Sequence, residues 1–469
     1  MAERKVVIIG GGFSGTALAI QLASMSDFPL DITVVEPRPA LGEGVAYSTR
    51  EPALRINVPA RKMQLGGRPD GDFERWCQQQ PDYVLDAAAH ASHGDYYPQR
   101  HLFGRYVAEH FAAAASARPG VTLRHLQDSA LDVSNGLVLT HGGQILAADA
   151  VVLAVSHPPP AIPAALRPYA DDPRLISNPW ASGALRQIAP NERVVIMGSG
   201  LSMADVVGTL AEQGHRGEIL AFSRRGQRPR PNFPGGAPQW EGDYGSQPVS
   251  GVRSLLRQVR LDVERAAAEG LPWQSVLDSV RASGQWIWLS LPLAEQRRFL
   301  RHLRSWWDVH RYRLAPQLGR LLERLEGEGR FSLHAARLQS LRARSDFLEL
   351  TLNHGGQATI TTADRLVLTT GPAHGGLIES QPLLRSLHAQ GAIRADAQGL
   401  GLAVDVHSQA LGVDGAPVPG LWVAGPAARG RFGELMGLPQ VAEHAVSVAY
   451  EVLAALHHPQ PHSARCPVC

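Results

Sequence analysis

The chain opens with the pattern of a dinucleotide-binding unit. Residues 5–9 form a short β-branched run with no polar residue after Lys5, which is typical of a parallel strand buried on both faces. A glycine-rich stretch, 10–15, follows, and residues 16–23 then favour a helix. A second buried strand, 32–35, ends at Glu36. Strand, glycine loop, helix, strand and acid in this order predict one half of a Rossmann-like domain.

The same order of elements recurs in the middle of the chain. Residues 193–197 predict a strand, 198–203 a second glycine-containing loop, 204–213 a helix and 217–222 another strand. This strand ends at Ser223-Arg224-Arg225, where the first unit has an acid. The internal repeat predicts an α/β protein with two Rossmann-like dinucleotide-binding domains.

Further buried runs at 150–155, 366–371 and 421–425 suggest how the two domains share the chain. We expect an FAD-binding domain interrupted by an NAD(P)-binding domain that carries a helical insertion, followed by a mobile tail. The expected bounds are 1–160 for the first part of the FAD domain, 175–362 for the NAD(P)H domain with its insertion at about 250–328, 363–456 for the second part of the FAD domain, and 457–469 for the tail.

The first loop has the residues that a bound pyrophosphate requires. Gly10 allows a sharp turn, Gly12 lets the backbone approach the phosphates, and Gly15 lets the helix lie close to the strand. The helix that starts with Phe13 and Ser14 presents unpaired N–H groups and the positive end of its dipole. Glu36 suits the ribose hydroxyls of FAD. The alternative is a glycine-rich turn in another α/β fold.

The second loop indicates a different nucleotide. Gly198, Gly200 and Ser202 match the phosphate-binding positions, but Met203 replaces the third glycine. Arginine at the end of the second strand suits a 2′-phosphate, so Arg224 and Arg225 favour NADPH over NADH. The alternative is a solvated arginine pair after an exposed strand end.

The last third of the chain has the residues needed to complete the flavin site. Gly425 follows a buried strand and suits backbone contact with the FAD pyrophosphate. Gly437, Leu438 and Pro439 precede the final predicted helix, about 440–456, with proline near its first turn. The N-terminus of that helix suits negative charge on the reduced flavin.

The composition limits the classes of binding partner that we expect. Net charge is +2 and no long run of like charge occurs, so neither nucleic acid nor an anionic membrane is expected. No stretch approaches about 20 uninterrupted apolar residues, so we expect no membrane span. The 3 cysteines are too few for a disulfide framework, and we therefore expect a cytoplasmic protein. No resident metal site is expected, and a homo-oligomer stays open.

Several stretches together resemble bacterial FAD/NAD(P)-binding flavoproteins related to the flavin-containing and the N-hydroxylating amine or amino-acid monooxygenases. They include VVIIGGGFSGTALAIQL, VVEPRPALGEGVAYST, INVPARKMQL, VVIMGSGLSMADVV, HRGEILAFSRRG and GLWVAGPAARGRFGELMGLPQV. The resemblance implies that NADPH reduces FAD, and that O₂ then forms a C4a-hydroperoxide that oxygenates nitrogen or sulfur. The implied substrate is a small amine, an amino acid, a thiol or a thioether.

The resemblance also assigns residues near the isoalloxazine. Gly42, Gly44 and the 57–64 loop match positions where these proteins approach the flavin ring. Asn57 and Gln64 are the candidate catalytic residues, because either amide suits flavin N5 or the nicotinamide carboxamide; the alternative is ordinary turn capping. Gly425-Pro426 departs from the Gly-Asp of many flavoproteins, which puts one ribityl contact in doubt.

Two features leave alternatives open. Cys466 and Cys469 have CxxC spacing, which admits an NAD(P)H-linked flavin oxidoreductase that inserts no oxygen and uses the tail thiols. A helix bearing Trp307, His310 and Arg311 on one face suits either a substrate pocket, with arginine binding a carboxylate, or ordinary packing. A third hypothesis, a non-catalytic nucleotide-sensing module, is disfavoured by the intact first loop.

Overall fold

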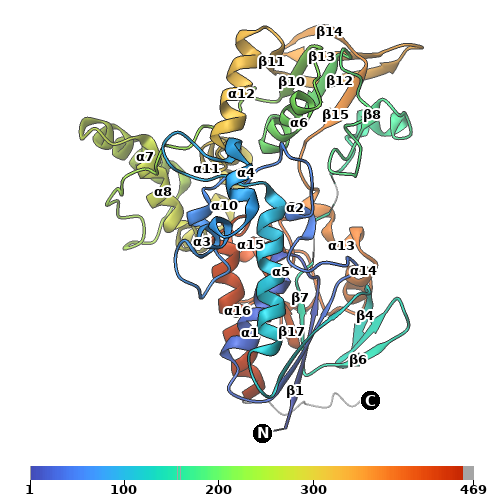
Figure 1. Ribbon diagram of the computed structural model, residues 1–469, viewed down its shortest axis with the longest axis vertical. Helices are drawn as coiled ribbons and strands as arrows, with labels where there is room; N and C mark the ends of the chain where they lie inside the picture. The colour runs from blue at the N-terminus through green and yellow to red at the C-terminus, as the bar shows by residue number, and fades with distance from the viewer. Residues whose placement is uncertain (1, 156, 159, 458–469) are drawn as a thin grey trace.

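A computed structural model describes residues 2–155, 157–158 and 160–457 of the chain (Figure 1). The first domain is built on a six-stranded sheet in the order β16-β17-β7-β1-β2-β3, in which only β16 is antiparallel to its neighbour. Its strands are β1 (Arg4–Ile9), β2 (Leu30–Val35), β3 (Val121–Leu126), β7 (Ala150–Leu153), β16 (Gln409–Leu411) and β17 (Pro417–Val423).

Three long helices cover this sheet, namely α1 (Phe13–Met25), α5 (Arg100–Ser116) and α16 (Gln440–His457). Figure 1 shows them side by side, and α1 packs against both of the others. The last four residues of β1 are buried, as expected for a parallel strand covered on both faces. This core therefore joins the first and last thirds of the chain.

The second domain repeats the arrangement on a smaller, parallel sheet in the order β11-β10-β9-β15-β8. The strands are β8 (Leu175–Ile176), β9 (Val194–Met197), β10 (Ile219–Ser223), β11 (Phe331–Ala335) and β15 (Arg365–Leu368), with α6 (Leu201–Glu212) after β9. The predicted fold class, α/β with two Rossmann-like domains, is confirmed.

One predicted boundary needs correction. We expected the chain to return to the first domain at residue 363, but β15 pairs in parallel with β9 of the second domain. The chain therefore leaves the second sheet only after Leu368. A short buried run such as 366–371 suits a strand of either sheet, and the sequence pattern alone does not say which sheet it joins.

The helical insertion projects to one side of the molecule, where Figure 1 labels α7, α8, α10 and α11. Its helices run close to the expected 250–328. They are α7 (Val252–Ala268), α8 (Trp273–Ala282), α9 (Gly284–Ser290), α10 (Leu293–His302), α11 (Arg304–Arg311) and α12 (Pro316–Gly327), of which α12 packs on α6.

Most of the remaining elements were not predicted. The loop-rich segment after Glu36 contains short helices, and each domain carries a small antiparallel sheet. These elements are α2 (Gly44–Tyr47), α3 (Asp72–Gln78), α4 (Pro81–Leu85), α13 (Leu377–Ser380), α14 (Pro382–Ala389), α15 (Arg429–Phe432), β4 (Ala130–Ser134), β5 (Leu137–Thr140), β6 (Ile145–Ala147), β12 (Arg337–Ala343), β13 (Leu348–His354) and β14 (Gln357–Ala363). No helix of the described residues is long and apolar enough to cross a membrane.

Candidate functional site

The first glycine loop is held by contacts that only glycine permits. Gly10 has φ +106°, and a Cβ there would lie 2.3 Å from the carbonyl oxygen of Ala154. A Cβ on Gly15 would lie 1.9 Å from the carbonyl oxygen of Gly10, so α1 sits directly against the loop. Gly12 caps α1 without a side-chain hydrogen bond, which leaves the first-turn N–H groups of Phe13 and Ser14 without a side-chain cap.

Glu36 lies beside the same loop at the end of β2 and is only 5% exposed. One carboxylate oxygen accepts a hydrogen bond from the Gly11 N–H (2.8 Å), and the other accepts one from the Arg38 N–H (3.1 Å). Each oxygen keeps a further lone pair. The acid and the free helix N-terminus together fit the ribose and pyrophosphate of FAD.

Gly42 and Gly44 lie against the first glycine loop. The Gly42 N–H donates to the carbonyl oxygen of Gly11 (2.8 Å), and a Cβ on Gly44 would lie 3.1 Å from the Cα of Gly12. Both glycines therefore pack on the first glycine loop, at the end of the site that suits pyrophosphate. Their positive φ values, +81° and +51°, explain why glycine occurs at both positions.

The C-terminal part of the chain reaches the same place. Gly425 has φ +76°, and a Cβ there would lie 2.3 Å from Oγ of Ser14. The Gly425 N–H donates to Nδ1 of the buried His444 (3.1 Å). Gly437 and Leu438 line a cavity just before α16 begins. The structure thus brings Gly425 to the N-terminus of α1, as a flavin-capping segment requires.

The second glycine loop is more open. Gly198 has φ +125° and packs against Thr369, while Gly200 caps α6 without a side-chain hydrogen bond. Met203 is fully buried in the apolar core of the second domain, so the third glycine position is used for core packing. Ser202 faces two cavities.

Arg224 and Arg225 follow β10 on the surface, and their contacts differ. The Arg225 guanidinium donates to the carbonyl oxygen of His302 (3.1 Å) and lies 5.7 Å from the ring centre of Trp306. Arg224 is exposed, and no described residue forms a hydrogen bond or ion pair with its side chain. Arg224 is therefore free to meet a phosphate at the strand end.

A cavity of ≈340 Å³, which we call the central cavity, lies where both domains and the insertion meet. Asn57 lines it, and its Oδ1 is buried without a hydrogen-bond partner. Gln64 is not among the residues that line this cavity. The walls are formed by residues 46, 47, 56–59, 62, 63, 95, 97, 100, 180, 201, 202, 205, 232, 233, 236, 237, 278, 281, 311–313 and 436–438.

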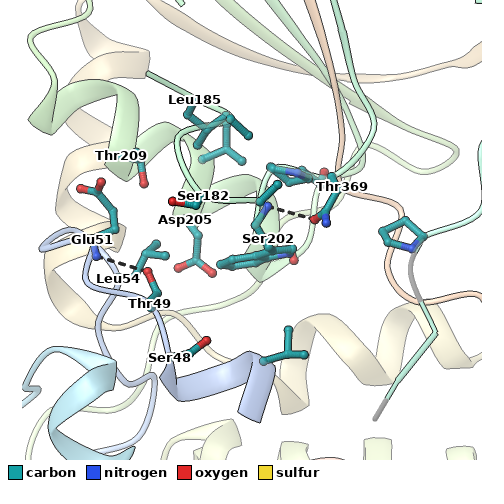
Figure 2. Close-up of a pocket in the computed structure, with 18 of the residues that line it drawn as sticks. Ser48, Thr49, Glu51, Leu54, Ser182, Leu185, Ser202, Asp205, Thr209 and Thr369 are labelled. Atoms are coloured by element: carbon teal, nitrogen blue, oxygen red, sulfur yellow. Dashed lines mark hydrogen bonds between the residues drawn. The ribbon is translucent and has the colours of Figure 1, made fainter. Parts of the chain in front are cut away.

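A second cavity of ≈830 Å³, the linker cavity, borders α6 as well (Figure 2). Ser202, Asp205 and Thr209 of α6 face Ser48 and Thr49 of the first domain across it. Ser202 and Asp205 line both cavities, so the two spaces meet at the N-terminus of α6. A ligand bound at that helix end borders both.

Two sets of interdomain contacts escaped the sequence prediction. Arg100 of α5 donates to both carboxylate oxygens of Asp205 (3.0 and 2.9 Å), and burial raises the pKa of Asp205. The insertion holds the capping segment, residues 425–440, through Glu434, which accepts from Nε1 of Trp307 (2.6 Å) and Nε of Arg311 (2.8 Å). The only sequence signal was the face of α11 that carries Trp307 and Arg311.

Neither redox thiols nor a metal cluster appears in the described part of the chain. Cys77 is its one cysteine; it is fully buried, and burial raises the pKa of its thiol. No group of three or more His, Cys, Asp or Glu residues there is arranged to hold a metal ion. Cys466 and Cys469 lie outside the described residues.

Comparison with known proteins shows which solved structures share this fold. A search of curated protein sequences finds no significant match. Among solved structures, ornithine hydroxylase from Pseudomonas aeruginosa has a TM-score of 0.63 at 16% identity, over 97% of this chain and 100% of that one. Ornithine N-hydroxylase from Kutzneria sp. 744, whose structure holds reduced FAD, NADP⁺ and L-ornithine, has a TM-score of 0.60 at 16% identity (97% and 99%).

Cadaverine monooxygenase from Erwinia amylovora, bound to FAD, has a TM-score of 0.60 at 14% identity, over 95% of this chain and 94% of that one. Residues 7–158 match the model of a protein family described as FAD-NAD(P)-binding. This range contains the first glycine loop, Glu36 and Asn57. The chain therefore has the fold of the N-hydroxylating flavin monooxygenases, and its residues 7–158 are similar to the FAD-NAD(P)-binding family.

Proposed function

We propose that the protein is an NADPH-dependent FAD monooxygenase that oxygenates nitrogen or sulfur of a small molecule, with an amine as the first candidate and thiols or thioethers as further ones. One observation carries the proposal. The N-terminus of α6, from the nicotinamide domain, and the start of α16, from the flavin domain, border the same central cavity through Ser202 and Leu438. A hydride donor and a flavin bound at these helix ends would meet there.

Bound FAD would supply the oxygen-activating chemistry, and the residues of the chain would orient and shield it. In the overall reaction NADPH gives two electrons, one oxygen atom of O₂ enters an N–H bond or adds to sulfur, and the other leaves as water. Asn57 Oδ1, buried and without a partner, suits an N–H donor from the substrate or from the nicotinamide carboxamide.

The test is anaerobic reduction of the FAD-loaded protein by NADPH, followed by mixing with oxygenated buffer while the flavin spectrum is recorded. We expect a transient spectrum, distinct from both oxidised and reduced flavin, that lasts longer with NADP⁺ bound. Prompt return to oxidised flavin without such a transient would instead favour an oxidoreductase that inserts no oxygen, and a screen of electron acceptors would follow.

The preference for NADPH gives a separate prediction. Arg224→Ala removes a free guanidinium that we assign to the 2′-phosphate, so KM for NADPH should rise about 10- to 100-fold while KM for NADH changes little. Arg216→Ala, which removes an exposed arginine elsewhere in the same domain, is the control and should change neither value. Equal effects of Arg224→Ala on both coenzymes would remove the 2′-phosphate assignment.

A further inference from the structure

The charges around the central cavity are not balanced. Three carboxylates line it, and each is already held by an arginine, in the pairs Asp95–Arg61 (2.7 Å), Asp205–Arg100 (2.9 Å) and Asp278–Arg313 (2.8 Å). Arg311, also in the lining, is held by Glu434 (2.8 Å). The lining therefore offers no free carboxylate to a ligand.

Two lining cations have no carboxylate partner. Arg281, near the end of α8, donates from Nη2 to the carbonyl oxygen of Leu438 and to Oε1 of Gln440, both at 2.9 Å, and its Nε is buried without a hydrogen-bond partner. Lys62 makes no side-chain hydrogen bond or ion pair with a described residue. The two cations lie on separate elements, one from the insertion and one from the first domain.

A partly buried guanidinium that forms no ion pair is costly unless a ligand supplies a partner charge. Burial lowers the pKa of Arg281 to about 10, with a further contribution from Arg311, so this side chain remains charged at neutral pH. Guanidinium binds carboxylate in two-point geometry, and an excess of positive charge in a cavity attracts anions and repels cations.

We propose, resting on the proposed function, that the substrate is a small amine with two anionic groups, such as an amino dicarboxylic acid. Its anionic groups pair with Arg281 and Lys62, and its amine donates to Oδ1 of Asn57. Diamines and diamino acids, the substrate types in the names of the structural neighbours, add positive charge to a cavity that already has an excess of it. The specificity therefore differs from that of these neighbours.

A binding measurement tests this substrate proposal without catalytic turnover. Calorimetric titration of the FAD-loaded protein with NADP⁺ present should detect succinate, which has two carboxylates and no amine, and should detect no binding of cadaverine. Arg281→Met and Lys62→Met should each weaken succinate binding about tenfold or more. Arg297→Met, which removes an exposed arginine from the same insertion, is the matched control and should leave the affinity unchanged.

Cadaverine binding as tight as succinate binding, no binding of either, or unchanged succinate affinity in Arg281→Met would each overturn the proposal. The last result, combined with an altered flavin reduction potential, would assign Arg281 to the flavin instead. Circular dichroism checks that each variant is folded, and Lys62→Met, at an exposed position, keeps the test valid if Arg281→Met does not fold.

Turnover separates this inference from the proposed function. With aspartate or glutamate as substrate, NADPH oxidation should be coupled to hydroxylamine formation more tightly than with ornithine, lysine or cadaverine. Coupled hydroxylation of the cationic amines alone would overturn the inference and leave the monooxygenase proposal standing. Release of only hydrogen peroxide with every amine, despite succinate binding, would do the reverse.

Discussion

Gly15→Ala is expected to abolish FAD retention. The added Cβ would lie 1.9 Å from the carbonyl oxygen of Gly10 and 3.1 Å from Cβ of Ala154, so α1 would have to move away from β1. The added Cβ would meet backbone on one side and a core side chain on the other, so no flexible group could move aside to make room for it. Displacement of α1 costs about 3 kcal/mol or more and moves the N–H groups away from the phosphates, so we expect about hundredfold weaker FAD binding.

The measurement is the flavin-to-protein absorbance ratio of the purified variant, with a titration of added FAD and circular dichroism to check folding. Gly319→Ala is the control, because a Cβ on that glycine of α12 meets no atom within 4 Å. It should keep wild-type flavin content. Full flavin content in a folded Gly15→Ala variant would contradict the assignment of this loop to FAD.

The first loop could be predicted from sequence because its determinants are local. Strand, glycines, helix and acid lie within 36 residues, and the closest contact of Gly15 is with Gly10 of the same loop. The second loop was found by the same order of elements, although Met203 takes the place of the third glycine. A buried methionine at that position requires more room between α6 and the sheet. The spacing of the glycines alone does not predict this packing.

What escaped prediction depends on contacts between distant segments. Arg100 and Asp205 are 105 residues apart, and each alone is an ordinary charged residue on a helix. The Gly42 N–H donates to the carbonyl oxygen of Gly11 in the first loop, a contact that the sequence did not predict. The antiparallel sheet β12-β13-β14 alternates buried and exposed residues in part, but its exposed edge strand β14 has almost no apolar signal.

The helical insertion shows why the candidate site could be only partly predicted. Its sequence indicated amphipathic helices rich in arginine, and both a pocket wall and simple packing were consistent with that. In the structure Arg311 does both, because it lines the central cavity and holds Glu434 of the capping segment. The insertion belongs to the nicotinamide domain in the chain, yet it contacts the flavin domain where α16 begins. Movement of the nicotinamide domain would therefore affect the flavin domain through these contacts, and the reverse.

Acidification is expected to destabilise the capping segment through His444. This side chain is 6% exposed; its Nδ1 accepts from the Gly425 N–H, and its Nε2 lies 3.0 Å from Oγ of Ser408. Acceptance at Nδ1 requires the neutral ring, and burial lowers the pKa of His444 to about 4 from a usual 6.5. A proton on Nδ1 would bring a second N–H donor against the Gly425 N–H. The repulsion between the two donors would move Gly425 away from Ser14.

The direction of the effect follows from these two pKa values. Above pH 6.5 the ring is neutral in both folded and unfolded chains, so no stability is lost. Between pH 6.5 and about 4 the unfolded chain binds a proton that the folded chain excludes, and stability falls by about 3 kcal/mol across this window. Flavin release, followed by fluorescence, should rise over the same range.

His444→Gln isolates this contribution, because glutamine is a polar residue of similar length that does not titrate. Burial also lowers the pKa of His101, His110 and His215, so the wild-type profile reports several groups, and the difference between wild type and His444→Gln is the informative quantity. His141→Gln, at an exposed position, should retain the wild-type profile. If His444→Gln lost flavin with the same pH dependence as wild type, another group would govern the acid sensitivity, and the bond between His444 and Gly425 would be structural only.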